Sequence, residues 1–306
     1  MSARSETRAH VLRAIACNRV PGFHFPGHFL GVRWREVGSD SARLVLPDGR
    51  HFRDGHVNVH FLALAVFIDV ALGTAVRLQD DYRQRQATTY LQLQLTGIPA
   101  TGELDARVRN RGRSADGRAD YSFGEATVEA DGGVIARATG TFARLDPPPG
   151  VALGPLPWQR DNLPSSLPDE STLDASERAV LARCDRALSD AGPDVPFVER
   201  FWGADPPFRD AGKSARIAVG AHIGNRVGHV QGGILLGIAA LAAERAVPSG
   251  MRLSNASVWF LRPGLESLVV TSTLVHRGNT SALVVTDIRS DDGGAVVKAV
   301  TQHVTA

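Results

Sequence analysis

The chain has 306 residues, of which 43% are hydrophobic and 22% are charged, and its 34 basic and 32 acidic residues leave a formal net charge of +2. This length favours two domains of ordinary size, and the composition is typical of a folded soluble protein. A nearly neutral chain lacks the overall charge that would favour nucleic acid or a membrane surface as a partner.

Three features bear on the compartment. Cys17 and Cys184 are far apart and match no metal-ligand spacing, which predicts two reduced thiols in a cytoplasmic protein. Residues 7–17 lack the apolar core of a signal peptide and predict a short surface helix. The most apolar run, residues 57–76, contains His60 and Asp69, which would be costly in lipid, so it predicts a buried helix of a soluble protein.

Two stretches about 170 residues apart repeat one order of elements. In the first, strand-like residues 32–47 lead to Gly55-His56-Val57-Asn58, an apolar helix and further alternating segments. In the second, residues 215–219 lead to Gly228-His229-Val230-Gln231, a helix rich in Ala and Leu, and again alternating segments. Each copy has a hairpin turn between two such segments, at residues 131–133 and 292–294. The chain therefore contains a duplication.

The duplication predicts the domain organisation. Residues 147–168 are too rich in proline and glycine for a helix or a central strand and form a linker, and residues 173–189 predict a short helix. We expect a first domain over 1–146 with an N-terminal helix, a linker with its helix over 147–194, and a second domain over 195–306. A long apolar helix among alternating strands, twice, predicts α+β domains in which an antiparallel sheet wraps each helix, paired as a pseudo-dimer.

The second copy carries motifs of a known family. They are Gly228-His229-Val230-Gln231-Gly232-Gly233-Ile234-Leu235, Trp259-Phe260-Leu261-Arg262-Pro263-Gly264 and His276-Arg277-Gly278-Asn279. Together they resemble the hot-dog thioesterases: the phenylacetate-pathway type, whose helix opens with His-Gly-Gly, and the acyl-CoA thioesterase II type, which has a comparable Phe-Leu-Arg-Pro-Gly strand. In this sequence Gln231 replaces the histidine of the first type. The resemblance implies two tandem hot-dog domains and an acyl-CoA thioesterase.

The first copy resembles the other half of such a site. Residues 59–69 are similar to the helix in the C-terminal half of the acyl-CoA thioesterase II type, where a histidine precedes the catalytic aspartate by nine positions, as His60 precedes Asp69. The first copy lacks the glycine pair and has residues 59–60 or 61–62 there, while the second has Ala240 or Ala242 opposite the acid. The resemblance therefore implies one complete site, built from Asp69 and the helix start of the other domain, and one inactive site.

The resemblance and general chemistry together assign roles. The N–H groups of Gly232 and Gly233 at a helix start would stabilise an oxyanion, with close packing of the helix against a sheet as the alternative explanation for these glycines. Asp69 would act as general base or as nucleophile, and a paired structural acid is its alternative. Gln231 would position the carbonyl or a water. Thr89, or its neighbour Thr88, resembles the hydroxyl residue that holds the attacking water.

Substrate contacts are predicted elsewhere in the chain. Asn58 and His60 precede the first long helix and are candidate binding residues. Arg107, Arg109, Arg111 and Arg113 alternate along one strand, so Arg111 and Arg113, with Arg277 in the second copy, are candidate contacts for the phosphates of CoA. A charged edge strand is the alternative. No dinucleotide, Walker or zinc motif is present in the sequence, so we expect no cofactor besides the CoA of the substrate.

Other functions stay open from the sequence. The segment His24-Phe25-Pro26-Gly27-His28-Phe29 resembles the Gly-His-Phe-Pro motif of hot-dog hydroxyacyl dehydratases, although a strand region separates it from the long helix. A dehydratase or hydratase, or a silent acyl-CoA binder, are therefore alternatives. The acyl group is not specified, and a homodimer of the double-domain chain is expected because paired hot-dog units commonly assemble further.

Overall fold

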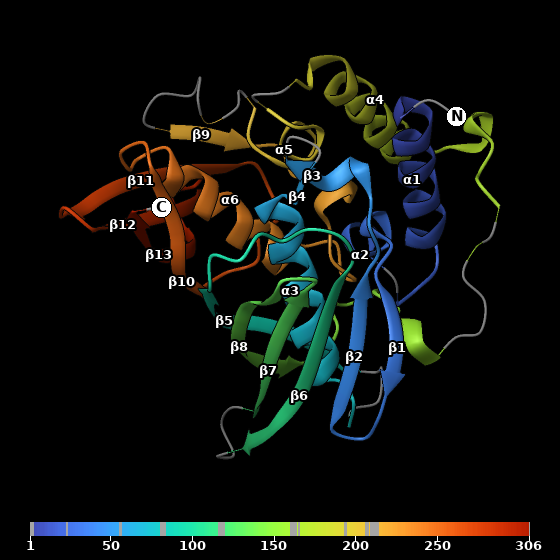
Figure 1. Cartoon of the computed structure of the whole chain (residues 1–306). Helices are drawn as coiled ribbons and strands as arrows, with labels where there is room; N and C mark the ends of the chain where they lie inside the picture. The colour runs from blue at the N-terminus through green and yellow to red at the C-terminus, as the bar shows by residue number, and fades with distance from the viewer. Residues whose placement is uncertain are drawn as a thin grey trace.

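A computed structural model describes residues 3–22, 24–54, 57–79, 84–115, 120–159, 164, 166–192, 195–205, 208 and 214–305. Within these residues, an 11-stranded antiparallel sheet curves around two long helices, and further helices pack on one side (Figure 1). The predicted α+β class, with an antiparallel sheet wrapped around a long helix in each copy, is confirmed. Among the described helices, none is long and apolar enough to cross a membrane.

The sheet strands of the first copy are β1 (Arg33–Val37), β2 (Ser41–Leu46), β5 (Arg85–Leu95), β6 (Leu104–Ala115), β7 (Asp120–Ala130) and β8 (Gly133–Leu145). Those of the second copy are β9 (Ser214–Ile217), β10 (Met251–Phe260), β11 (Leu268–Arg277), β12 (Ser281–Ser290) and β13 (Ala295–Thr305). Two short strands, β3 (Arg53–Asp54) and β4 (Asn58–Val59), pair separately.

The order of the strands shows the duplication directly. It runs β1-β2-β6-β7-β8-β5-β10-β13-β12-β11-β9, so the second half mirrors the first about the β5–β10 pair, with β1 added at one end. Strands β5 and β10 pair antiparallel from Tyr90 opposite Trp259 to Gln94 opposite Asn255. The two copies therefore share one continuous hydrogen-bonded sheet related by a pseudo-twofold axis.

Each copy contributes one long central helix, α3 (Phe61–Ala75) or α6 (Gly232–Glu244), which packs against the strands of its own half and against the other helix. The helices form because long apolar runs follow a capping residue. The side chain of His60 accepts a hydrogen bond from the Leu62 N–H, and the side chain of Gln231 accepts one from the Ile234 N–H. Every residue of α3 from 62 to 75 is buried, so apolar burial from all sides stabilises it.

The two central helices approach closely because α6 carries small residues at the contact. A Cβ atom on Gly233 would lie 2.5 Å from the Ala65 carbonyl oxygen, and a Cβ on Gly237 would lie 2.6 Å from Cδ2 of Leu62. Both glycines face α3 one helical turn apart. The bulkier residues of α3 thus lie against the two glycines of α6.

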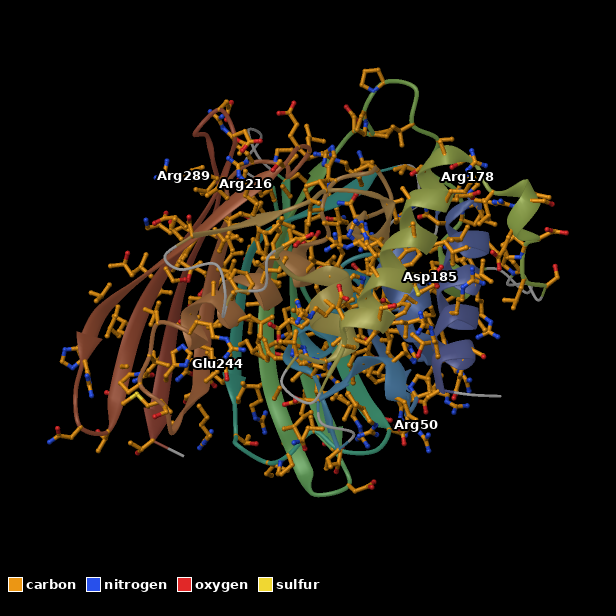
Figure 2. The ribbon with its side chains drawn as sticks, turned by 90° about the horizontal axis from the view of Figure 1, so that it is seen from above. Arg50, Arg178, Asp185, Arg216, Glu244 and Arg289 are labelled. Carbon is orange, nitrogen blue, oxygen red and sulfur yellow. The ribbon has the colours of Figure 1, made fainter. Side chains whose placement is uncertain are left out.

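The remaining helices are α1 (Ala3–Asn18), α2 (Phe25–Leu30), α4 (Ala175–Asp190) and α5 (Phe197–Trp202), with 3-10 turns η1 (Arg50–Phe52), η2 (Pro157–Gln159), η3 (Glu170–Thr172) and η4 (Ala221–Ile223). Helix α4 runs beside α1, and Figure 2 shows Asp185 between them, where it accepts a hydrogen bond from Arg8 (3.1 Å). Helices α1 and α4 lie where the sequence predicted an N-terminal helix and a helix after the linker. The sequence alone did not predict that they pack together.

The structure settles the register of the repeat. Each central helix follows a 3-10 turn at the same spacing, from Arg50 to His60 and from Ala221 to Gln231. His60 is therefore the counterpart of Gln231, and Ala240 is the counterpart of Asp69, nine residues after the cap. Of the two registers that the sequence allowed, the one that places residues 61–62 opposite the glycine pair is the observed one. The sequence match at Gly55-His56 falls outside the described residues.

The alternative explanation of the arginines, a charged edge strand, is wrong. Strand β6, which carries the alternating arginines, pairs with β2 on one side and β7 on the other, so it is not an edge strand. Its inward positions Leu104, Ala106 and Val108 are buried, which confirms that the arginines before the bulge occupy the outer face. The register shifts between Asn110 and Gly112, so the strict alternation ends at Arg111.

Candidate active site

A cavity of about 290 Å³ lies between the two copies, along α3 and the start of α6. Its wall comes from α3, β5, β8, the loop before α6, the end of β10 and the proline-rich linker. Exposed residues at its rim are Leu145, Leu261 and Arg262, whereas Leu156 of the linker is only 2% exposed. The cavity is thus open at one side and covered by the linker at another.

Asp69 lies in the wall of this cavity, in the middle of α3, and is 8% exposed. Its Oδ2 atom accepts a hydrogen bond from Nε2 of Gln231 (2.6 Å), which belongs to the other copy. Its Oδ1 atom accepts one from the Thr88 hydroxyl (3.2 Å) on β5. Because Oε1 of Gln231 caps the Ile234 N–H (2.9 Å), the amide is oriented with its NH₂ group toward Asp69. The acid is therefore fixed by both halves of the chain.

The glycine pair at the start of α6 divides into two roles. Gly232 lines the cavity, and a Cβ atom on it would lie 3.1 Å from Oδ1 of Asp69 and 3.2 Å from the Thr88 hydroxyl. Gly233 faces α3, and its N–H donates to Asp69. The first N–H groups of a helix have no partner within the helix. Since Ile234 is capped and Gly233 is bonded, the Gly232 N–H is the donor that this helix start offers to a ligand.

Burial determines the protonation of the acid. Desolvation raises the pKa of Asp69 from 3.8 to about 6, against the opposing effects of the hydrogen bonds from Gly233 and Thr88 and of the nearby charge of Arg77. Asp69 is therefore mostly ionised at neutral pH, with a pKa close to the range in which a carboxylate is an efficient general base. An acid so perturbed in a cavity is a feature of functional sites.

The structure separates Thr88 from Thr89. Both line the cavity, but only the Thr88 hydroxyl contacts Asp69; the Thr89 hydroxyl donates to the Thr141 carbonyl (3.0 Å). The sequence favoured Thr89. The register of β5 against β8 shifts between Thr88 and Tyr90, and this bulge changes which side chain points to the helix.

The predicted binding residues outside the helix starts lie away from the cavity. His60 caps α3 and faces Glu199 of α5, with 3.7 Å between Nε2 and Oε2. Asn58 is in the separate pair β3–β4. Arg111 pairs with Glu125 (3.4 Å), Arg113 bonds Asp120 (2.6 Å), and Arg277 ends β11 opposite Ala282. The described cavity lining includes none of these five residues.

Other residues that line the cavity were missed. They are Trp34, Arg77, Arg85, Leu156, Trp158 and Arg226, together with His24 of the dehydratase-like segment. Trp34 donates to the Thr74 hydroxyl (3.0 Å), and its ring lies 5.7 Å from that of Trp158. Arg262 also lines the cavity, and for it a signal existed, because it stands within the Phe-Leu-Arg-Pro-Gly motif. Trp34 and Arg85 belong to β1 and β5, and the others come from the linker, the N-terminal segment and the loops. No periodicity in the sequence reveals how these segments pack around the cavity.

Comparisons with known proteins bear on the family and on the fold. Residues 223–305 match the family described as the acyl-CoA thioesterase N-terminal domain. No curated protein matches the sequence. Among solved structures, the chain is similar to one assigned as an oleoyl thioesterase from Lactobacillus plantarum, with a TM-score of 0.53 and 11% identity over 88% of this chain and 97% of that one. It is also similar to the 12:0-ACP thioesterase from Umbellularia californica, with a TM-score of 0.53 and 11% identity over 87% of this chain and 94% of that one.

These likenesses extend over both copies, and at such low identity they concern the fold. The expected resemblance is confirmed at two levels, in the sequence of the second copy and in the architecture of the whole chain. The chain has a tandem hot-dog fold, and its residues 223–305 match the family model of the acyl-CoA thioesterase N-terminal domain.

Proposed function

We propose that this protein hydrolyses acyl thioesters in the cavity between its two copies, with Asp69 as the reacting acid. The observation that carries the proposal is the composite contact: a buried carboxylate from α3 bonded to Gln231 of the other copy, beside the Gly232 N–H. A buried carboxylate is costly unless its surroundings or its function compensate for the loss of water. The family match over residues 223–305 supports the same chemistry.

In the proposed reaction the thioester carbonyl lies against the start of α6. A water gives a proton to Asp69 while its oxygen bonds to the carbonyl carbon, and the resulting oxyanion accepts a hydrogen bond from the Gly232 N–H. One such donor is typically worth about 3 to 4 kcal/mol of transition-state stabilisation. Collapse of the intermediate breaks the C–S bond, and the leaving thiolate receives the proton that Asp69 holds. The acid is then regenerated for the next turnover.

Direct attack by Asp69 is the second form of this mechanism. A carboxylate oxygen would bond to the carbonyl carbon and release the thiolate, leaving a mixed anhydride for water to cleave. The two forms differ in the fate of labelled oxygen. A single turnover in ¹⁸O-water leaves Asp69 unlabelled if it acts as a base, whereas water attack on the aspartyl side of an anhydride labels it.

The charges at the rim fit a CoA thioester. Arg262 is exposed at the mouth of the cavity, and Arg85 begins β5 three residues before Thr88. Arginine binds phosphate well because its planar group donates two parallel hydrogen bonds. We therefore propose Arg85 and Arg262, in place of Arg111, Arg113 and Arg277, as the contacts for the phosphates of CoA. An acyl-carrier-protein thioester, the substrate type in the name of the Umbellularia californica enzyme, would present one phosphate to the same residues.

The geometry of His24 argues against a dehydratase. Its Nδ1 atom accepts a hydrogen bond from the Gly27 N–H (3.3 Å), so the neutral ring carries its proton on Nε2. Burial, with the positive charges of Arg77 and Arg226 nearby, holds the pKa of His24 well below its usual range. A neutral ring with Nε2–H in the cavity can donate a hydrogen bond but cannot take a proton from substrate. The lyase needs that base, and the hydrolase does not.

The test is thiol release from a panel of acyl-CoA thioesters by the wild-type protein and by Asp69→Asn. We expect kcat/KM to fall by a thousandfold or more in Asp69→Asn, because the amide can neither accept the proton nor attack. Asp291→Asn, which changes a surface acid paired with Arg216, is the matched control and should leave the rate unchanged. Equal rates in wild type and Asp69→Asn would place the reacting group elsewhere, and no release from any thioester would refute the hydrolase.

A further inference from the structure

One short turn of the linker forms the covered side of the cavity. Residues 156–159, which we call the linker turn, include the 3-10 turn η2. The turn is closed on itself, because the Gln159 N–H donates to the Leu156 carbonyl (2.8 Å) and the Gln159 side chain accepts a hydrogen bond from the Leu156 N–H (2.9 Å). The linker turn places two large side chains, Leu156 and Trp158, in the wall of the cavity.

Trp158 is connected to the central helix through a second tryptophan. Its ring centroid lies 5.7 Å from that of Trp34 on β1, and the indole N–H of Trp34 donates to the Thr74 hydroxyl of α3 (3.0 Å). This hydroxyl donates in turn to the Val70 carbonyl (2.9 Å), and Thr74 is only 2% exposed. The two rings are therefore fixed relative to the helix that carries Asp69.

The residues just before the linker turn are fixed as well. Nη2 of Arg226 donates to the Gly154 carbonyl (3.3 Å). Gly22 packs on the next peptide, since a Cβ atom on it would lie 2.4 Å from the Pro155 carbonyl oxygen, and its φ of +99° also favours glycine. These contacts hold the linker against the cavity on both sides of Leu156, so the linker turn is a fixed part of the wall.

The α3 residues that line the cavity relate the acid to this wall. They are Asp69, Val70, Gly73, Thr74 and Arg77. At about 100° per residue they cover a helix face of about 140°, with Asp69 at one margin and Thr74 at the other. Thr74 also lies about 7.5 Å further along the helix axis than Asp69. Asp69 and the tryptophan pair therefore stand at opposite margins of the same face, with Val70 and Gly73 between them.

The opening of the cavity determines which part of a thioester faces the linker turn. The rim residues Leu145, Leu261 and Arg262 are exposed. A cavity of about 290 Å³ is about twice as large as one of roughly 150 Å³ that holds a single benzene molecule, so the nucleotide of CoA must stay outside. The pantetheine arm then leaves through the opening. With the carbonyl between Asp69 and Gly232, the covered side receives the acyl group.

We propose that Leu156 and Trp158 of the linker turn, with Trp34, form the end wall of the acyl pocket and restrict the substrates to apolar acyl groups of about eight carbons or fewer. This inference rests on the proposed thioesterase function and specifies its substrate class. An extended carbon chain advances roughly 1.2 Å per bond, so about six bonds cover the axial distance from Asp69 to Thr74. The three side chains of the wall bury the apolar chain, which favours its binding.

The test is a chain-length series. Thiol release from butanoyl-, octanoyl- and dodecanoyl-CoA gives kcat/KM for wild type and for variants of the wall. Wild type should prefer octanoyl-CoA to dodecanoyl-CoA by tenfold or more. Leu156→Ala and Trp158→Ala open the wall and should each lower this preference at least fivefold. Leu156→Phe narrows the pocket and should lower the rate with octanoyl-CoA relative to butanoyl-CoA at least fivefold.

Two matched variants serve as controls. Leu167→Ala removes a leucine of the same linker that is 43% exposed, and Trp259→Ala removes a tryptophan that is 40% exposed. Neither residue belongs to the cavity lining that the structure describes, so both ratios should stay unchanged. Because each ratio compares substrates within one variant, a loss of folded protein cancels from it.

The outcomes separate this inference from the proposed function. Equal rates of wild type with octanoyl-CoA and dodecanoyl-CoA would overturn the chain-length limit and leave the hydrolase intact. Changes at Leu156 and Trp158 that alter the rates of all three substrates equally would also overturn it, because these side chains would then contact the pantetheine arm. Failure of wild type to cleave any thioester would refute the hydrolase itself, and this inference with it.

Discussion

The Asp69 site and its pseudo-symmetric counterpart share one backbone plan but differ at every reacting position. At the first, Asp69 meets Gln231, Gly232 and Thr88. At the second, Ala240 replaces the acid, His60 replaces the glutamine, and Leu253 replaces the threonine. Leu253 is the counterpart of Thr88 because each residue stands directly before the bulge of its strand, β10 or β5. The fold therefore requires the helices, caps and bulges, and it does not require the acid.

The same comparison explains the glycines. The contact of Gly233 with Val66 has its counterpart in the contact of Leu62 with Gly237, and in both cases α6 supplies the glycine. Leu62 is thus the counterpart of the packing glycine, and at the second site Phe61 stands in the position of Gly232, which lines the cavity. The two helices therefore have different roles. Helix α3 carries the acid and the large side chains at the helix contact, and α6 carries the glycines and the open helix start.

Moving the acid from α3 to α6 tests the difference between the two sites most strongly. Asp69→Ala should lower kcat/KM by a thousandfold or more, and adding Ala240→Asp should restore none of it. Leu253 offers the new carboxylate no hydroxyl, and Phe61 stands where the first site has the open helix start at Gly232. Relative to Asp69→Ala, the double variant should also lose about 2 to 4 kcal/mol of unfolding free energy, because it buries an unsatisfied acid. Thiol release and urea denaturation check both effects. Recovered activity would show that the second site is functional.

Alanine at each member of the glycine pair separates packing from chemistry. Gly233→Ala should destabilise the fold by about 3 kcal/mol, because its Cβ would press on the backbone of α3 at Ala65 and Val66. Gly232→Ala should cost less than about 1 kcal/mol in stability and lower kcat/KM by about tenfold to a hundredfold, since its Cβ meets only the side chains of Asp69 and Thr88. Denaturant midpoints and rates should therefore rank the two variants in opposite orders. If one variant had the larger loss in both stability and rate, the separate roles of Gly233 in packing and Gly232 in chemistry would be contradicted.

The pH dependence tests the state of Asp69. Because the pKa of Asp69 is about 6, kcat/KM should fall as the pH drops below 6. The contribution of Asp69 to the unfolding free energy changes with pH in the opposite direction to kcat/KM. A carboxyl group whose pKa is higher in the folded than in the unfolded protein binds more protons when folded, so its contribution to stability is best at low pH and declines as the pH rises from 3.8 to 6.

Asp69→Asn should therefore raise the unfolding free energy by about 3 kcal/mol above pH 6, with no difference below pH 3.8. Urea denaturation of both proteins at pH 4 and pH 8 measures this difference, in which other titrating groups cancel. A destabilised Asp69→Asn at pH 8 would show that the acid serves the fold rather than the reaction.

The smallest expected effect concerns the two threonines. Thr88→Val should reduce kcat/KM by about tenfold, which corresponds to the loss of roughly 1.4 kcal/mol from one hydrogen bond to a charged group. Thr89→Val should change it less, since the Thr89 hydroxyl bonds the Thr141 carbonyl. Rates at saturating and at low substrate distinguish an effect on chemistry from one on binding. A larger effect at Thr89 would restore the order that the sequence favoured.

The sequence predicted what depends on periodicity and repetition. Two apolar helices with matching caps and two sets of alternating strands were enough to predict the duplicated α+β fold, and the unmatched Asp69 and Gly232 pointed to one shared site. The sequence could not predict what depends on a single irregularity. The bulge between Thr88 and Tyr90 turns the Thr88 side chain, rather than that of Thr89, toward Asp69. The linker that positions Arg226 has no periodic pattern of apolar residues from which its path could be predicted.

The glycines of α6 also bear on how such a protein can evolve. In a dimer of identical chains every substitution appears on both sides of the twofold axis, so a residue that opens one helix start opens the other, and an acid placed in one helix is placed in both. A fused chain with its shared β5–β10 ladder is free of that constraint. Gly233 and Gly237 could be acquired by one copy while Leu62 and Val66 were kept by the other, and each copy is then free to supply a different part of the one shared site.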